Sequence, residues 1–153
     1  MKTILIAVDD SKGSLATLET YGNLFTCVRP ETTYLLSVQK IEGRSLMDEM
    51  LGVAEMSTLK EQLEGTDYKD ALDKKATAIL DHHKKKLEER GVTGIKTMVR
   101  QGHPADEILD VAKSVNAEMI IIGSRGKRLH TLLMGSVSRE IANNAEVPVL
   151  IAR

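Results

Sequence analysis

Tryptophan is absent from this 153-residue chain, and the aromatic residues are limited to three tyrosines and one phenylalanine. Proteins that hold single-stranded nucleic acid stack its bases on aromatic rings, so such a role is not expected. An excess of one charge is also missing, because 21 basic residues face 22 acidic ones. Without a net field the chain has no general attraction to nucleic acid or to an anionic membrane. Neither is expected as a partner.

The chain has one cysteine, Cys27, and no long hydrophobic run. A single cysteine excludes an internal disulfide, which suits a reducing compartment. No segment approaches the ~20 apolar residues that span a bilayer. The apolar stretch at residues 3–8 is too short for a secretory signal. We therefore expect a cytoplasmic protein without a membrane anchor.

Short runs of apolar, often branched residues alternate with segments of helical periodicity. The runs that predict strands are 3–8, 32–38, 95–100, 117–122 and 147–153. The segments that predict helices are 11–25, 66–90, 104–115 and 136–144. The first strand is apolar throughout, which is typical of a parallel sheet covered on both faces. The alternation predicts an α/β fold, a single open doubly wound five-stranded parallel sheet with helices on both faces, Rossmann-like in architecture.

Serines and a proline mark the predicted helix starts. Ser11 or Ser14 is expected to cap the first helix, whose apolar positions at helical spacing are Leu15, Leu18, Gly22 and Phe25. Pro104 suits the first turn of the third helix, and His103 before it is expected to act as a cap.

The histidines form no zinc pattern, and no metal site is predicted. His82 and His83 are adjacent, so on a helix they point about 100° apart and cannot share an ion as an i, i+4 pair can. His83 falls on the apolar stripe of the second helix and is expected to be a hydrogen-bonded histidine at the edge of the core.

One domain over residues 1–153 is expected from the length. Residues 41–65 interrupt the alternation and are rich in methionine, which predicts a helical insertion. Methionine adapts to irregular surfaces, so this insertion is either a helix packed on the body or an adaptable lid or partner surface.

Two glycine-rich turns follow the apolar run at 117–122. Gly123 lets the backbone turn sharply as it leaves the strand, and Gly126 permits close backbone approach. Gly135 and Ser136 open a helix whose first amides have no internal acceptor and whose partial positive charge suits a phosphate. An ordinary surface turn with a serine cap fits the residues equally well. A P-loop is excluded, since no G-x-x-x-x-G-K-[ST] is present.

Four stretches resemble the universal stress protein family: ILIAVDDSKGSLATLE, GHPADEIL, AEMIIIGSRG and GSVSREIANNAEVPVLIAR. The similarity covers the chain apart from residues 41–65. The nucleotide-binding branch of the family carries G-x2-G-x9-G-[ST]. Gly123, Gly126, Gly135 and Ser136 follow this order, with eight residues instead of nine between the second and third glycines. The shorter gap reduces the reach of the loop by at most ~3.5 Å.

The resemblance implies that the chain binds ATP, ADP or AMP, and it leaves open whether Mg²⁺ accompanies the nucleotide. It places Asp9 at the ribose or beside the adenine, and Ala7 and Val38 around the base. Ile122 would lie near the sugar. The implied phosphate cradle consists of Gly123, Gly126, Gly135, Ser136 and Val137. The resemblance also implies a homodimer formed through the strand at 147–152.

The resulting hypothesis is an ATP-binding regulatory stress protein whose partner interactions depend on nucleotide occupancy. A stress-related homodimer that binds no nucleotide is the alternative. No catalytic residue is predicted, because no fixed lysine or base is aimed at water, and any ATP hydrolysis would be slow. A phosphatase or ligase has no signature here. A response-regulator receiver is disfavoured, since the third predicted strand ends in MVRQGH, without an aspartate.

Overall fold

The structure is a computed structural model and describes residues 2–27, 29–40, 67–124 and 134–153. The predicted helical insertion at 41–65 lies outside these residues. The strands are β1 (Thr3–Ala7), β2 (Thr32–Gln39), β3 (Ile95–Gln101), β4 (Met119–Gly123) and β5 (Val149–Ala152). The helices are α1 (Lys12–Leu24), α4 (Asp67–Glu89), α5 (Pro104–Ser114) and α6 (Ser136–Asn144).

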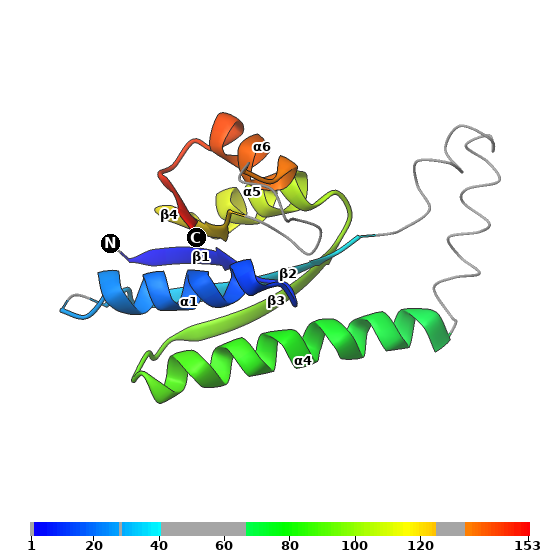
Figure 1. The fold of residues 1–153 in the computed structure, drawn as a ribbon, viewed down its shortest axis with the longest axis horizontal. Coiled ribbons are helices and arrows are strands. Elements are labelled where there is room, and N and C mark those ends of the chain that lie inside the picture. Colours follow the sequence, from blue (N-terminus) through cyan, green and yellow to red (C-terminus); the bar gives the residue numbers. More distant parts are fainter. Residues whose placement is uncertain (1, 28, 41–66, 125–133) are drawn as a thin grey trace.

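The five strands form one parallel sheet in the order β3-β2-β1-β4-β5 (Figure 1). From β1 the chain builds outward through β2 to β3, then crosses to the other side of β1 and continues through β4 to β5. The predicted open doubly wound sheet is confirmed. The expectation of one domain over residues 1–153 stays a prediction.

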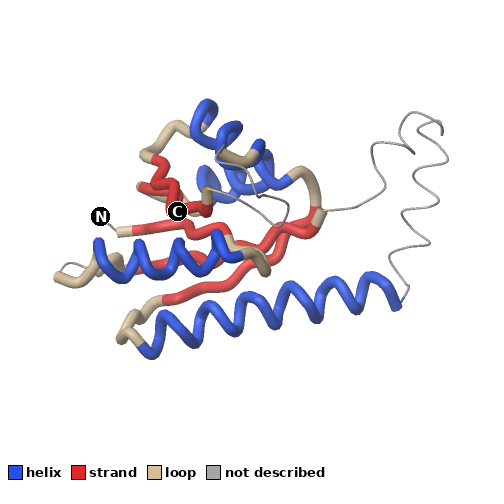
Figure 2. The backbone as a smooth tube through the Cα atoms, in the orientation of Figure 1, coloured by secondary structure: helices blue, strands red, loops and turns tan. Residues whose placement is uncertain are grey.

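Side-chain alternation along the strands divides the core into two layers. Ile4 and Ile6 of β1 pack in one cluster with residues of α1 and α4, whereas Leu5 packs in a second cluster with residues of α5 and α6. Strand β4 divides in the same way, with Ile121 in the first cluster and Ile120 in the second. The two helix pairs lie on opposite faces of the sheet (Figure 2). Burial on both faces explains why these strands are apolar throughout.

The buried face of α1 matches the predicted one at Leu18, which is buried, and at Phe25, which packs against the core. Tyr21 is also buried, whereas Leu15 is 39% exposed. The Tyr21 hydroxyl and the Thr33 hydroxyl lie 2.8 Å apart in a hydrogen bond. The expectation for Leu15 is wrong because the neighbouring Ser14 is the residue turned inward, where it bonds to the turn after β1.

Helix α4 places His83 in the core, where the side chain is 4% exposed. Its Nδ1 lies 2.7 Å from the carbonyl oxygen of Ile79. Its Nε2 is buried without a hydrogen-bond partner in the described part of the chain. The prediction of a hydrogen-bonded histidine is therefore correct for one ring nitrogen and wrong for the other. Burial lowers the pKa of His83, and the hydrogen bond to Ile79 and the carboxylate of Asp9 oppose that shift in part.

Acidification is expected to destabilise the fold in part through His83. Because its folded-state pKa lies below the ordinary value of 6.5, the unfolded chain binds more protons once the pH falls through that value. The stabilisation is present above pH 6.5 and is lost as the pH falls towards the folded-state pKa. His83→Leu should show a smaller drop in melting temperature on acidification from about pH 7.5 to about pH 5, because it has no group to protonate there.

The neighbouring His82 provides the control, because its side chain is exposed. His82→Leu should keep the acid sensitivity of the parent chain. Equal acid sensitivity in His83→Leu and the parent would contradict the role given to His83.

Candidate functional site

The order of the strands reverses between β1 and β4, which are adjacent in the sheet. Helix α1 follows β1 on one face, and α6 follows β4 on the other. In open α/β sheets, ligands bind outside the carboxyl ends of the strands at such a point. The residues after these two strands are therefore the first candidates for a binding site.

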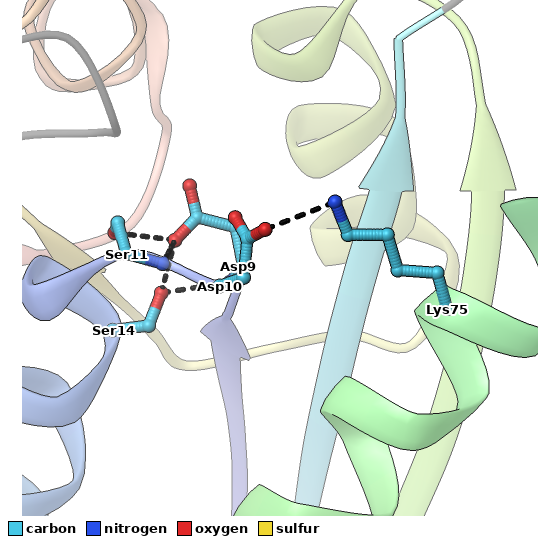
Figure 3. Close-up of polar contacts among 5 residues, drawn as sticks. All are labelled: Asp9, Asp10, Ser11, Ser14 and Lys75. Atoms are coloured by element: carbon cyan, nitrogen blue, oxygen red, sulfur yellow. Dashed lines mark hydrogen bonds and ion pairs between the residues drawn. The ribbon is translucent and has the colours of Figure 1, made fainter.

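Asp9 organises the turn between β1 and α1 (Figure 3). Its Oδ1 accepts hydrogen bonds from the Ser11 amide at 2.9 Å, from the Ser11 hydroxyl and from the Ser14 hydroxyl at 2.6 Å. The Asp9 amide donates to Ser14 Oγ at 2.7 Å. Ser11 occupies the N-cap position of α1 but makes no side-chain cap bond. The predicted serine cap is therefore correct in position but not in its side-chain bond, because both hydroxyls bind Asp9 instead.

The second carboxylate oxygen of Asp9 is left for other partners. In Figure 3 it points away from Ser11 and Ser14, and the hydrogen bonds recorded for this side chain among the described residues all end on Oδ1. Asp9 is only partly buried. The turn thus fixes the carboxylate through one oxygen and presents the other as an acceptor.

Helix α4 is joined to the same edge of the sheet by polar contacts that sequence analysis missed. Lys75 Nζ lies 3.1 Å from Asp10 Oδ2 (Figure 3). Gln39, at the end of β2, donates to Asp73 Oδ1 at 2.9 Å and accepts from Gln101 Nε2 at 2.9 Å. Gln39 is 8% exposed, so its side chain is held within this network. No local signal predicts these contacts, since the partners come from separate elements.

Gly123 lies where β4 meets the start of α1. A Cβ at this position would lie 2.7–2.9 Å from backbone atoms of Gly13. Real Cβ atoms do not approach backbone so closely, and backbone cannot move aside as a flexible side chain can. Glycine is therefore required by the close approach of α1 to β4, a reason different from the sharp turn that the sequence suggested.

Ser124 ties the end of β4 to the start of α6. Its carbonyl oxygen accepts from the Gly135 amide at 2.9 Å and from the Ser138 hydroxyl at 3.2 Å. Its amide donates to the carbonyl of Ala152 at 2.7 Å. The Gly135 amide thus has a protein partner. Together with the Gly123–Gly13 contact, these bonds bring the starts of α1 and α6 to the last residues of one strand.

The start of α6 has unused donors. Gly135 is the N-cap residue and supplies no side-chain bond. Among the described residues, no acceptor is recorded for the amides of Ser136 and Val137. The first turn of α6 has no acidic residue, whereas that of α5 carries Asp106 and Glu107. The positive end of α5 is therefore compensated by its own carboxylates, and that of α6 is not.

The apolar residues predicted to surround a base and a sugar belong to one cluster. Ala7, Val38 and Val137 are partly buried and pack against the core on the α5 and α6 side, where Ile122 is a buried member. They come from three adjacent strands and from the first turn of α6. The structure brings these four residues to one face of the sheet, and Asp9 and Ser136 lie close to two of them along the chain. Gly126, the remaining predicted residue, lies outside the described part of the chain.

His103 does not cap α5 with its side chain, although it occupies the N-cap position. Its Nδ1 lies 3.3 Å from Asp106 Oδ2, and its Nε2 lies 3.8 Å from Glu140 Oε2 on α6. The predicted capping role is wrong, because the ring turns towards the two carboxylates.

The family model described as "Universal stress protein family" matches residues 1–153. The chain belongs to the universal stress protein family. Universal stress protein MJ0577 of Methanocaldococcus jannaschii is 30% identical over 156 residues, which cover 99% of this chain and 94% of that protein. A solved structure of MJ0577 matches with a TM-score of 0.74 at 26% identity, covering 99% and 94% of the two chains.

Two further solved universal stress proteins share the fold at 20% identity. One, solved in complex with cAMP, has a TM-score of 0.66 and covers 99% of this chain and 96% of its own. The other, from Archaeoglobus fulgidus in complex with dAMP, has a TM-score of 0.68 and covers 100% and 98%. This universal stress protein has, in its described part, no helix both long and apolar enough to cross a bilayer.

Proposed function

We propose that this universal stress protein is an ATP-binding regulatory protein that holds its nucleotide at the carboxyl edge of β1 and β4. The observation that carries the proposal is the start of α6. Among the described residues, no acceptor is recorded for the amides of Ser136 and Val137, the first turn carries no carboxylate, and bonds through Ser124 fix this turn beside β4. Donors at a helix start with a partial positive charge bind phosphate.

Each predicted site residue then has a physical role. The adenine lies against Ala7 and Val38, the sugar lies near Ile122, and the free oxygen of Asp9 accepts from a ribose hydroxyl. The phosphates bind the amides of Ser136 and Val137, with the Ser136 hydroxyl and Gly126 as further contacts. Gly123 and Gly135 shape the cradle, since one admits α1 and the other bonds to Ser124.

The cAMP and dAMP complexes of two relatives support the choice of an adenine nucleotide. Their fold is the fold of this chain, and their ligands share adenine, a sugar and a phosphate group. ATP, ADP and AMP all present these groups, and Mg²⁺ would accompany the longer phosphate chains. We assign no catalytic residue, so the proposed role is occupancy-dependent binding of a partner in the cytoplasm.

A thermal-shift titration with ATP and Mg²⁺ tests the proposal. A ligand at 100 times its dissociation constant stabilises the folded state by ~2.7 kcal/mol. For a domain of this size, the melting temperature should rise by roughly 5–10 °C. The melting temperature of protein freed of copurified nucleotide could also stay unchanged at millimolar ATP. That result would favour the alternative, a stress-related homodimer that binds no nucleotide.

Asp9→Asn should weaken ATP binding by about tenfold, which corresponds to ~1.4 kcal/mol. The asparagine oxygen can replace Oδ1 in the turn, but the amide group that replaces Oδ2 cannot accept from a ribose hydroxyl. Isothermal titration calorimetry should be performed with ATP and with 2′,3′-dideoxy-ATP. The parent chain should prefer ATP, and the variant should bind both nucleotides alike. An undiminished preference for ATP in Asp9→Asn would remove Asp9 from the ribose site.

We also propose a homodimer formed through residues 147–152. Strand β5 lies at the edge of the sheet, and its residues Val149, Leu150 and Ile151 are only partly buried. An apolar edge strand favours pairing with a second copy. Light scattering should give a solution mass twice that of one chain.

A further inference from the structure

We infer that His103, Asp106 and Glu140 form a binding site for a divalent transition-metal ion such as Zn²⁺. One ligand atom from each residue lies within 4.8 Å of the other two. The site includes none of the residues assigned to the nucleotide. It joins the start of α5 to the middle of α6, two helices that pack against each other on one face of the sheet (Figure 1).

Each ring nitrogen of His103 faces one carboxylate at a distance longer than a direct hydrogen bond. A charge-assisted bond between a ring nitrogen and a carboxylate is about 2.7–2.9 Å long. Here Asp106 Oδ2 lies 3.3 Å from Nδ1, and Glu140 Oε2 lies 3.8 Å from Nε2. One ion binds only one of the two nitrogens, and two ligands at about 2.0–2.1 Å from a tetrahedral Zn²⁺ lie roughly 3.3 Å apart. With one ligand atom taken from each residue, the three atoms lie within 4.8 Å of one another, so side-chain rotation has to bring them together around an ion.

The chemistry of the ligands selects the class of ion. Imidazole nitrogen suits Zn²⁺ and its neighbours in the transition series, whereas Mg²⁺ and Ca²⁺ prefer oxygen ligands alone. A histidine with two carboxylates gives three protein ligands, and water completes a tetrahedral shell. His103 and Asp106 are exposed and Glu140 is half-buried, so solvent and ion can enter. The ion would neutralise two negative charges that face the ring.

The alternative is a surface ion pair between a protonated His103 and the two acids. The side chains of His103 and Asp106 are 51% and 69% exposed. Exposed pairs of this kind contribute little to stability, because solvent screens them. The two interpretations differ in what added metal does, since an ion pair gains nothing from Zn²⁺.

Calorimetric titration of the complete chain with ZnCl₂ tests the site. The protein should be metal-stripped, free of nucleotide and without a histidine tag. Cys27 is an exposed free cysteine, and thiolates are zinc ligands, so Cys27→Ser is the parent for all variants. We expect one saturable site per chain. His103→Ala and Glu140→Gln should each weaken it at least about tenfold, because each removes one of three ligands.

His82→Ala provides the matched control, since His82 is an exposed histidine outside the cluster. It should bind Zn²⁺ as the parent does. Zn²⁺ should also raise the melting temperature of the parent and of His82→Ala but not that of His103→Ala. Co²⁺ should give the visible absorption of a four-coordinate ion in the parent but not in His103→Ala.

Two results would overturn the inference: titrations that show no saturable binding, or equal affinities in the parent, His103→Ala and Glu140→Gln. The cluster would be a plain ion pair if His103→Ala melts at a lower temperature than the parent and Zn²⁺ changes the melting temperature of neither protein. All measurements are made without nucleotide, so a failure of the zinc site and a failure of the ATP site remain distinguishable.

Discussion

Replacing Ser136 by aspartate should weaken ATP binding by about tenfold or more, while the melting temperature stays unchanged or rises. A carboxylate in the first turn of a helix interacts favourably with its positive end, by about 0.3–1 kcal/mol. The first turn of α6 has no acidic residue, so this stabilisation is available. The same carboxylate would occupy the free amides and repel the phosphates. A repulsion of ~1.4 kcal/mol lowers affinity tenfold.

The opposite directions of the two effects make this variant informative. A substitution that merely damages the fold lowers stability and affinity together, whereas Ser136→Asp should separate them. Ala142→Asp adds the same charge at an exposed position near the other end of α6 and should bind ATP like the parent. Affinity is measured by isothermal titration calorimetry, and the melting temperature is measured by differential scanning calorimetry. Unchanged affinity in Ser136→Asp would place the phosphates elsewhere.

Gly123→Ala should lower the melting temperature by roughly 3–10 °C in a domain of this size. The added Cβ would lie 2.7 Å from the carbonyl carbon of Gly13. Helix α1 must then move away from β4, and such overpacking costs about 1–3 kcal/mol. The displacement also shifts the Asp9 turn, because Ser14 of α1 holds it. ATP binding should weaken as a secondary result.

Gly22→Ala is the matched control within α1. Its new Cβ would lie 2.8 Å from Nη1 of Arg90, the far end of a flexible side chain. Arg90 can rotate, and alanine is favoured over glycine inside a helix by about 0.5–1 kcal/mol. The melting temperature should therefore stay close to that of the parent. Equal losses in the two variants would show that the backbone contact of Gly123 is unimportant.

The secondary structure was predictable because the signals for it are local. The apolar runs of β1 and β4 are buried on both faces, and Pro104 begins α5 as expected. The prediction failed at one position of a helix face that was otherwise correct. The sequence favours Leu15 beside Leu18 as a core residue of α1, but the bonds between Ser14 and Asp9 place Ser14 inward and leave Leu15 exposed.

The resemblance to a family motif named the site residues and their nucleotide contacts, but not the contacts that they make within the protein. It implies that Gly123 and Gly135 both belong to the phosphate cradle. The structure shows that Gly123 is packed against Gly13 and that the Gly135 amide bonds to Ser124. The phosphate-binding role of Ser136 and Val137 stays a prediction.

The sequence by itself determined the α/β class, the order of the described elements and the membership of a family. The class and the order follow from residue periodicity, which acts over a few positions and survives any change in distant contacts, and the family follows from the four stretches that resemble it. Tertiary structure alone decided which residues meet across elements. Gln39 bonds to Asp73, and His103 approaches Glu140, because strand order and helix packing bring them together. No local pattern encodes such pairs, since each depends on where another part of the chain comes to lie.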